Sequence, residues 1–231
     1  MNPTLILSAT HGNEAFSIPV VEKLKSKFSF DWLISNPKAL KQGTRFFQAD
    51  LNRSAPGDSQ SKIYELRRAA ELIKLSANYQ QTIDLHGTIA NTGIFIILSD
   101  SNWQNIELAK KFDVPNVVLW PSLQPKGPIT QFAKGLELEC GPKNTRFTAK
   151  ELQRILERFL AGKPRRVNQT FYIVTGSLKT PVKRKMKDFV STSYKGATFT
   201  PLLADQYPGI KCYCMQKLES PLDFNTTNKT L

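Results

Sequence analysis

The sequence predicts an α/β protein in which a mixed, mostly parallel sheet is flanked by helices and is followed by a small β domain. Between residues 1 and 163, short β-branched runs alternate with longer segments of helical periodicity, a pattern that builds a mostly parallel sheet covered by helices. After Gly162 and Pro164 this periodicity ends, and the β-rich runs FYIVTGSL and IKCYCMQKL follow. The hydrophobic fraction of 40% and the charged fraction of 22% are ordinary for a folded globular protein.

Each expected strand is a short apolar run next to a turn-forming residue such as Gly12 or Pro37. We expect these strands at 4–9, 30–35, 82–85, 93–99, 116–120 and 135–140. Helical periodicity predicts helices at 15–28, 59–77, 103–112 and 148–160. Thr148, followed by Glu151 three residues later, has the pattern of a capping box, so we expect it to open the last of these helices.

The chain has 231 residues, which is enough for one sizeable domain and a minor one. Gly162 and Pro164 end the last predicted helix, and the change in composition begins at the same place. We therefore divide the chain into an α/β domain at 1–163, a small β domain at 164–218 and a polar tail at 219–231.

The sequence is strongly basic, because 32 Lys and Arg against 19 Asp and Glu give a formal net charge of +13. Such a surface attracts anions. The densest basic patches are Lys163, Arg165 and Arg166, and then Lys183, Arg184, Lys185 and Lys187. They indicate either a binder of nucleic acid or acidic lipid, or a solvated strand edge protected by lysines. No zinc finger, helix-turn-helix or RNA-binding aromatic pattern accompanies them, so we expect no specific nucleic-acid partner.

We expect a cytoplasmic protein with no membrane partner. No stretch approaches the roughly 20 apolar residues that a membrane span needs. The start MNPTLILSAT lacks the basic and long apolar regions of a signal peptide. The three cysteines, Cys140, Cys212 and Cys214, cannot all pair with one another, which favours reduced thiols.

The two histidines of the sequence each end a predicted strand, in the runs SATHGNE and TIDLHG. Because the carboxyl ends of strands line one crevice in open α/β sheets, His11, Glu14 and His86 are expected to converge there. Two His and one Glu, with a fourth position left to water, are the ligands of a catalytic zinc site. The alternative is that both histidines are ordinary polar loop residues. Asp84 either orients one of the ligands or packs inside the sheet.

A zinc hydrolase also needs a carboxylate beyond the ligands, to take a proton from water and give it to the leaving group. The predicted strand GLELEC supplies Glu137 and Glu139, which share one face, so periodicity alone cannot choose between them. Glu139 lies nearer the end of the strand, and position therefore favours it. The alternative is that both belong to an amphipathic edge strand.

The segment GTRFFQADLNRSAPG lacks clear periodicity and carries Arg45, Asp50, Asn52 and Arg53. A guanidinium group binds a carboxylate through two parallel hydrogen bonds, and a neighbouring Asn adds a further donor. Such a loop suits an acidic substrate. The alternative is solvated loop polarity with an ion pair between Arg53 and Asp50.

Several stretches together resemble the succinylglutamate desuccinylase and aspartoacylase family, which is related to zinc carboxypeptidases. They fall in the order and spacing of that family, and they are HGNE at 11–14, Asn36 with Pro37, TRFFQADLNR at 44–53, DLHGTIANTG at 84–93 and GLELECGP at 135–142. The resemblance implies a zinc carboxypeptidase-like fold with a small β domain appended to it.

The resemblance also implies the roles of individual residues. It implies that His11, Glu14 and His86 hold one Zn²⁺ per chain and that Glu139 is the general acid/base. It further implies that Arg45 polarises the scissile carbonyl, that Asn52 and Arg53 hold the α-carboxylate of the substrate, and that a tyrosine contacts the substrate, with Tyr213 first and Tyr207 second. The sequence departs from aspartoacylases at Ile129, where they carry an arginine that grips a side-chain carboxylate; Lys126 and Lys134 lie nearby.

The expected function is therefore zinc-dependent hydrolysis of the amide bond of an N-acyl amino acid, a small anionic substrate. The first alternative is a zinc carboxypeptidase or amidase that acts on short peptides or cell-wall fragments, because the same residues would serve it. The second alternative is a basic protein that binds nucleic acid or acidic lipid through the last third of the chain.

Overall fold

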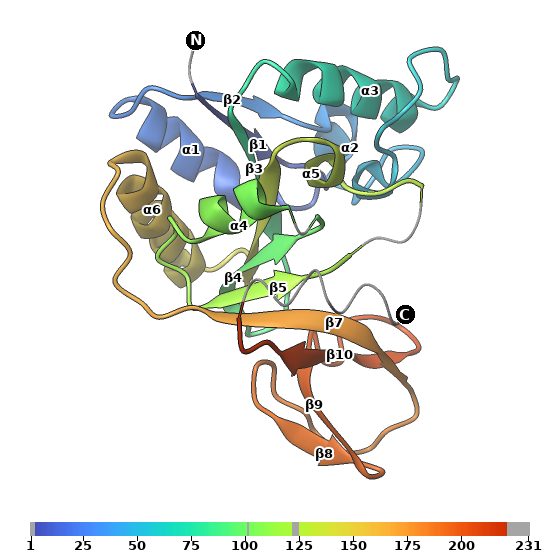
Figure 1. Ribbon diagram of the computed structural model, residues 1–231. Coiled ribbons are helices and arrows are strands. Elements are labelled where there is room, and N and C mark those ends of the chain that lie inside the picture. Colours follow the sequence, from blue (N-terminus) through green and yellow to red (C-terminus); the bar gives the residue numbers. More distant parts are fainter. Residues whose placement is uncertain (1–2, 101, 122–124, 221–231) are drawn as a thin grey trace.

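The computed structural model describes residues 3–100, 102–121 and 125–220, and it has the predicted α/β architecture (Figure 1). Its strands are β1 (Thr4–Ser8), β2 (Asp31–Ile34), β3 (Gln81–Gly87), β4 (Gly93–Leu98), β5 (Asn116–Leu119), β6 (Gly135–Gly141), β7 (Thr170–Lys179), β8 (Thr192–Tyr194), β9 (Ala197–Leu202) and β10 (Ile210–Lys217). Its helices are α1 (Ile18–Lys25), α2 (Pro37–Gln42), α3 (Tyr64–Ser76), α4 (Trp103–Ala109), α5 (Ile129–Phe132) and α6 (Arg146–Leu160), with short 3₁₀ helices η1 (Ala15–Ser17) and η2 (Leu51–Arg53).

One 10-stranded sheet runs through the described residues, in the order β2-β1-β3-β6-β4-β5-β7-β10-β9-β8. The pairs β1/β2, β1/β3, β3/β6, β4/β5 and β5/β7 are parallel, and β4 runs antiparallel to β6. The predicted mixed, mostly parallel sheet is thereby confirmed for the α/β part. The carboxyl ends of β1, β3 and β6 lie side by side, which sets the position of the site described below.

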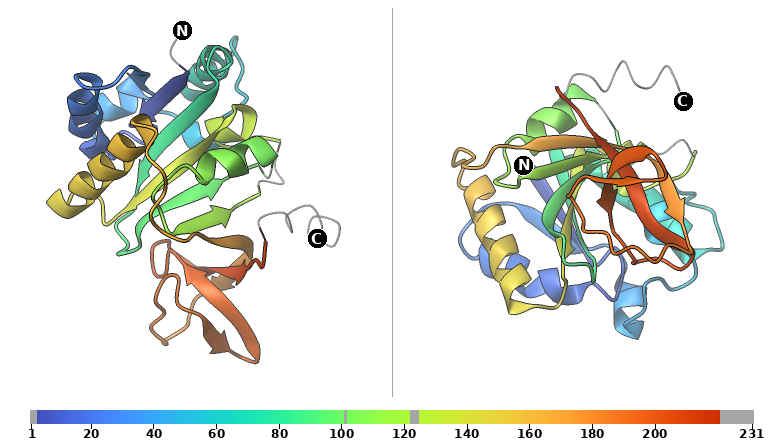
Figure 2. Two further views of the ribbon diagram at one scale, coloured as in Figure 1. Left: turned by 60° about the vertical axis from the view of Figure 1, so that its left-hand side comes forward. Right: turned by 90° about the horizontal axis from the view of Figure 1, so that it is seen from below.

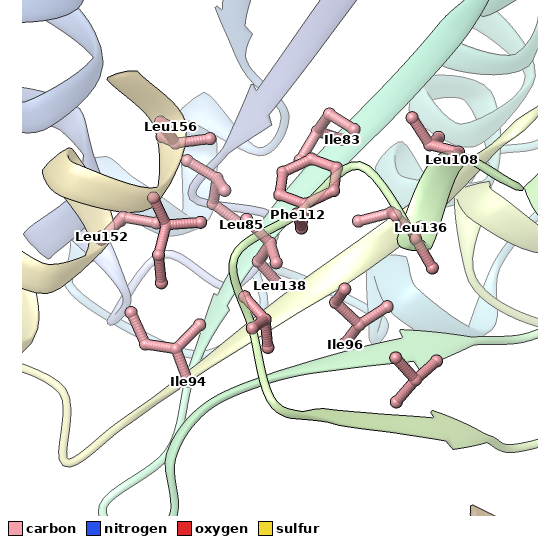
Figure 3. Close-up of a cluster of buried hydrophobic side chains, with 14 of the residues drawn as sticks. Ile83, Leu85, Ile94, Ile96, Leu108, Phe112, Leu136, Leu138, Leu152 and Leu156 are labelled. Carbon is pink, nitrogen blue, oxygen red and sulfur yellow. The ribbon is translucent and has the colours of Figure 1, made fainter. Parts of the chain in front are cut away.

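Alternate side chains of the central strands build the main core against α1, α4 and α6 (Figure 3). Leu85 of β3 and Leu138 of β6 are fully buried there, together with Leu152 and Leu156 of α6. Full burial of such a side chain contributes about 1.5–3 kcal/mol. Because successive strand residues point to opposite faces, the polar residues between these leucines project to the other face of the sheet.

That other face is covered by two groups of elements. Buried side chains of α3 and α5 pack on β1 at one end, around Leu7 and Leu72. At the other end, Leu202 of β9 and Met215 of β10 pack in one cluster with Phe95 of β4. The polar side chains of β3 and β6 therefore lie in the space between the α3 side and the C-terminal strands.

The C-terminal strands continue the sheet. β7 pairs in parallel with β5, and β10, β9 and β8 follow in antiparallel order. They extend from the edge of the α/β part as a twisted β unit (Figure 2). The division at residue 164 stays a prediction, and the polar tail predicted at 219–231 lies outside the described residues from position 221 onward.

Some predicted boundaries were wrong. Helix α6 is capped by Thr145 and not by Thr148, because the Thr145 hydroxyl accepts the Thr148 N–H at 3.1 Å while the buried Thr148 hydroxyl donates to the carbonyl of Pro142. The helix expected from residue 59 begins only at Tyr64, and the one expected at 15–28 opens as η1. The short helices α2 and α5 were not predicted. None of the described helices has the length and apolarity that crossing a membrane requires.

Candidate active site

The turn after β1 places His11 and Glu14 beside the end of β3, which carries His86. Ala9 turns the chain out of β1 with a φ of 53°. Gly12 then passes so close to α2 that a Cβ atom there would lie 2.1 Å from the carbonyl carbon of Ala39, so only glycine fits this position. Because β1 and β3 are parallel neighbours, the three polar residues meet at one edge of the sheet.

His11, Glu14 and His86 form a compact cluster, in which one ligand atom from each lies within 4.8 Å of the others. Nδ1 of His11 lies 3.1 Å from Oε1 of Glu14, and Nδ1 of His86 lies 3.4 Å from its Oε2. The three residues are 4%, 3% and 2% exposed, respectively. The sequence expectation that they converge is therefore met in the structure.

The far nitrogen of each imidazole faces a further carboxylate. Nε2 of His11 lies 3.2 Å from Oδ1 of Asp50, and Nε2 of His86 lies 3.1 Å from Oδ2 of Asp84. The second approach is an ion pair rather than an aligned hydrogen bond, since within the described part of the chain both atoms lack a hydrogen bond of good geometry. Thr10 holds Asp84 in place by donating to its other oxygen at 2.8 Å.

This donor set fits a divalent metal ion. Ligating histidines almost always turn their second nitrogen to a carboxylate, carbonyl or water, and both do so here. Burial disfavours a charged His11, but the carboxylates of Asp50 and Glu14 outweigh it and raise its pKa. Burial likewise favours a neutral Glu14, yet the two histidines hold its pKa far below the ordinary value. The cluster thus concentrates negative charge in an otherwise basic protein, which favours a cation.

Glu139 is the carboxylate beside this cluster without a hydrogen-bond partner among the described residues. It is the direct neighbour of His86 in the register between β6 and β3. Burial first, and then the charges of Glu14 and Glu137, raise the pKa of Glu139 to about 8. A carboxyl group that titrates near neutral pH, and lines a cavity, is suited to accept and return protons.

Glu137 has a different environment from Glu139, although the two share a strand face. Its Oε1 accepts hydrogen bonds from Ser99 at 3.2 Å and Thr130 at 3.1 Å, and its Oε2 accepts one from Asn52 at 3.3 Å. A carboxylate fixed by three donors is less free to exchange protons. Among the described residues, Glu137 is thus held by neighbouring side chains and Glu139 is not, and the general acid/base role of Glu139 stays a prediction.

The loop between α2 and η2 brings Arg45 and Asp50 to the cluster. Asp50 uses Oδ1 for His11 and Oδ2 for Arg45, at 3.1 Å from Nη2. The ion pair between Asp50 and Arg53, which the sequence left open, is not formed: Arg53 donates to the backbone carbonyl of Asn52, and no described carboxylate pairs with it. Arg53 thus keeps its charge available for a ligand.

Glu65 organises this loop, and the sequence reasoning missed it. The residue is fully buried, and its carboxylate accepts the consecutive backbone N–H groups of Phe47, Gln48 and Ala49 and the side-chain amide of Asn36. The signal that could have revealed it is its place on α3, on the same buried stripe as Ala69 and Leu72. An acidic residue in an apolar stripe needs fixed donors.

The cluster opens into a cavity of about 580 Å³ that Arg45, Asn52, Arg53 and Glu139 also line. Trp120 and Tyr213 form an aromatic wall, with ring centroids 4.4 Å apart, and Tyr207 lies 6.0 Å from Tyr213. Both candidate tyrosines therefore reach the cavity. Lys126 and Lys134, the two lysines near Ile129 in the sequence, are not among the residues that line the cavity. Ile129 itself is buried.

Lys143 is a second residue that the sequence reasoning did not select. It follows Pro142, the first residue after β6, lines the cavity, and places Nζ 3.5 Å from Oε1 of Glu14. Its position directly after the GLELECGP run is the signal that could have drawn attention to it.

Residues 1–162 match the succinylglutamate desuccinylase/aspartoacylase catalytic domain. A probable aspartoacylase of Prochlorococcus marinus subsp. pastoris is 31% identical over 173 residues, which cover 68% of this chain and 58% of that protein. An N-acyl-aromatic-L-amino acid amidohydrolase (carboxylate-forming) of Xenopus laevis is 30% identical over 116 residues, covering 42% of this chain and 38% of that protein. The chain thus matches at most about three fifths of the length of these curated relatives.

Solved structures show the same fold. Murine aminoacylase 3 superposes with a TM-score of 0.74 and 18% identity, covering 94% of this chain and 95% of that one. The succinylglutamate desuccinylase from Chromobacterium violaceum superposes with a TM-score of 0.72 and 18% identity, covering 95% of this chain and 86% of that one. Both the resemblance and the fold class predicted from the sequence are confirmed: this chain belongs to the succinylglutamate desuccinylase/aspartoacylase family.

Proposed function

We propose that the chain is a zinc-dependent amidohydrolase that cleaves the amide bond of an N-acyl amino acid. The observation that carries the proposal is the arrangement of His11, Glu14 and His86. The Nδ1 atoms of both histidines face the carboxylate of Glu14, and their Nε2 atoms face the carboxylates of Asp50 and Asp84. Glu139 lines the same cavity. This arrangement combines a place for a metal ion with a carboxyl group placed to move protons.

His11, Glu14 and His86 would hold the zinc ion, which would supply the Lewis acidity that makes water a nucleophile near neutral pH. Glu139 takes a proton from the attacking water and later gives it to the leaving nitrogen of the amide. Its raised pKa suits both halves of that task, because the group must be deprotonated in one step and protonated in the next.

The guanidinium groups complete the proposed site. Arg45, fixed by Asp50, donates hydrogen bonds to the carbonyl oxygen on which negative charge develops. Loss of one such preorganised donor typically lowers kcat about 10²- to 10³-fold. Arg53, with its neighbour Asn52, binds the α-carboxylate of the amino-acid portion, and Tyr213, which lines the same cavity, contacts the substrate.

The names of the curated relatives support an N-acyl amino acid as substrate, since one is a probable aspartoacylase and another an N-acyl-aromatic-L-amino acid amidohydrolase. The cavity volume of about 580 Å³ also suits a short peptide. A peptidase or amidase therefore stands as the second candidate, with the same residues in the same roles.

Two measurements test the proposal. Metal analysis of the purified protein should find one zinc per chain, and a panel of N-acyl amino acids and short peptides should show hydrolysis of the former. Glu139→Gln should keep the metal and lose turnover, whereas His11→Ala should lose both. Turnover of peptides alone would favour the second candidate, and equal activity in both variants and the wild type would refute the site.

A further inference from the structure

The carboxylate of Glu137 is a charged group in the cavity wall for which the mechanism above has no use. The residue is 4% exposed, and the three hydrogen bonds that it accepts come from the uncharged groups of Ser99, Thr130 and Asn52. Within the described part of the chain no Lys or Arg pairs with it; the nearest charge-bearing partner is Nε2 of His86, at 3.6 Å. Apart from this imidazole, no described cationic side chain therefore pairs with the carboxylate of Glu137.

The cationic side chains that line the cavity do not pair with Glu137. Arg45 is paired with Asp50, and Lys143 lies against Glu14. Arg53 lies near Tyr213, where its charge opposes the rise in pKa that burial causes in that tyrosine. Among the described residues that line the cavity, Arg53 is thus a guanidinium without a carboxylate partner, and Glu137 is a carboxylate without a Lys or Arg partner.

Besides its three hydrogen-bond donors and His86, Glu137 has apolar neighbours in the cavity wall. Ile97 and Trp120 line the cavity together with it, and Ile129, next to Thr130, is fully buried. In such surroundings a second carboxylate would meet repulsion in a medium of low polarity, whereas an ammonium group or another donor would be attracted.

The strand geometry puts this charge within reach of a substrate. Glu137 and Glu139 are two residues apart on one face of β6, which separates their Cα atoms by about 7 Å. The amino-acid side chain of a substrate whose amide bond lies beside Glu139 can span that distance. The α-carboxylate would then lie toward Arg53, and the side chain toward Glu137.

We infer that Glu137 is a specificity-determining residue, which selects N-acyl amino acids whose side chain carries an amine or another hydrogen-bond donor and rejects those whose side chain carries a carboxylate. This inference rests on the proposed function and names its substrate class. The selectivity between cationic and anionic side chains should reach about 10- to 100-fold.

Three compounds of similar length test it: the N-acetyl derivatives of ornithine, norvaline and glutamate. We expect kcat/KM of the zinc-loaded wild type to fall in that order. Glu137→Gln keeps the shape and removes the charge, so it should reduce the ratio of ornithine to glutamate derivative at least about tenfold. Thr130→Val is the matched control, because it removes one hydrogen bond to Glu137 but keeps the charge, and it should keep the ratio.

Calorimetric binding of the same compounds separates this inference from the proposed function. Absence of turnover with all three compounds would refute the proposed function, while a binding preference for the ornithine derivative that Glu137→Gln abolishes would still support the inference. Equal turnover or binding of the glutamate and ornithine derivatives by the wild type would overturn it. An unchanged ratio in a folded Glu137→Gln protein would overturn it as well.

Discussion

Asp50 bridges His11 and Arg45 with the two oxygens of a single carboxylate. Oδ1 lies 3.2 Å from Nε2 of the imidazole, and Oδ2 lies 3.1 Å from Nη2 of the guanidinium. These contacts hold the pKa of Asp50 far below its ordinary value, although burial alone would raise it. The proposed metal ligand and the proposed oxyanion donor are thus oriented by one residue.

Asp50→Asn should therefore impair both functions at once. The amide is uncharged and has only one acceptor oxygen, so it cannot serve both His11 and Arg45. We expect zinc affinity to fall about 10- to 100-fold, and kcat to fall even when the protein is saturated with zinc. Competition with a chromophoric chelator measures the affinity. If the variant binds zinc as tightly as the wild type, the contact with His11 does not tune the site.

Glu65 should matter for both stability and turnover. Glu65→Ala leaves the half-buried N–H groups of the loop at 47–49 without their acceptor, which should cost about 1–3 kcal/mol in the free energy of unfolding. Glu65→Gln should fold but lower kcat, because the loop carrying Arg45 and Asp50 is less firmly held. Urea titration and steady-state kinetics on zinc-loaded protein check these expectations.

The matched control is Glu71→Gln, on the same helix. Its carboxylate is largely exposed and pairs with Arg68 at 3.1 Å, so we expect a change within about 0.5 kcal/mol and unaltered kinetics. A Glu65→Gln variant that behaves like this control would contradict a positioning role.

Arg53→Ala should mainly raise KM, by about 10- to 100-fold, if the guanidinium holds the α-carboxylate equally in the ground and transition states. Arg53→Lys should give an intermediate KM, because an ammonium group keeps the charge but loses the two-pronged geometry. Initial-rate kinetics over a wide substrate range separates the two parameters. A large fall in kcat at constant KM would instead place Arg53 in transition-state stabilisation.

Asp113 should make the free energy of unfolding depend on pH in the acidic range. Burial alone would raise its pKa, but Arg154 and the backbone N–H of Arg166 outweigh burial and lower it below the ordinary 3.8. Because the folded-state pKa is the lower one, the stabilisation is complete above the unfolded-state pKa and is lost as the pH falls through the folded-state value.

Asp113→Asn should consequently cost about 1–3 kcal/mol at pH 7 and less at pH 3, which lies below the ordinary pKa of 3.8. Urea unfolding at both pH values, for wild type and variant, measures the difference. A cost that stays the same at both pH values would show that the charge of Asp113 does not contribute.

The sequence by itself determined the strand and helix alternation and the convergence of His11, Glu14 and His86. Both follow from local information, since periodicity reveals the strands and parallel strands present their carboxyl ends at one edge. Of the carboxylates on β6, position near the strand end sufficed to favour Glu139.

Only the tertiary structure decided which groups pair across the site. Asp50 contacts His11 and Arg45 and not Arg53. Glu65 accepts the N–H groups of a loop that lies 16 to 18 residues earlier in the chain. Glu137 accepts hydrogen bonds from Ser99, Thr130 and Asn52, which come from three separate segments. Periodicity describes which face of an element a residue occupies, but a hydrogen bond or ion pair depends on distances of a few ångströms between elements. Those distances exist only once the chain has folded.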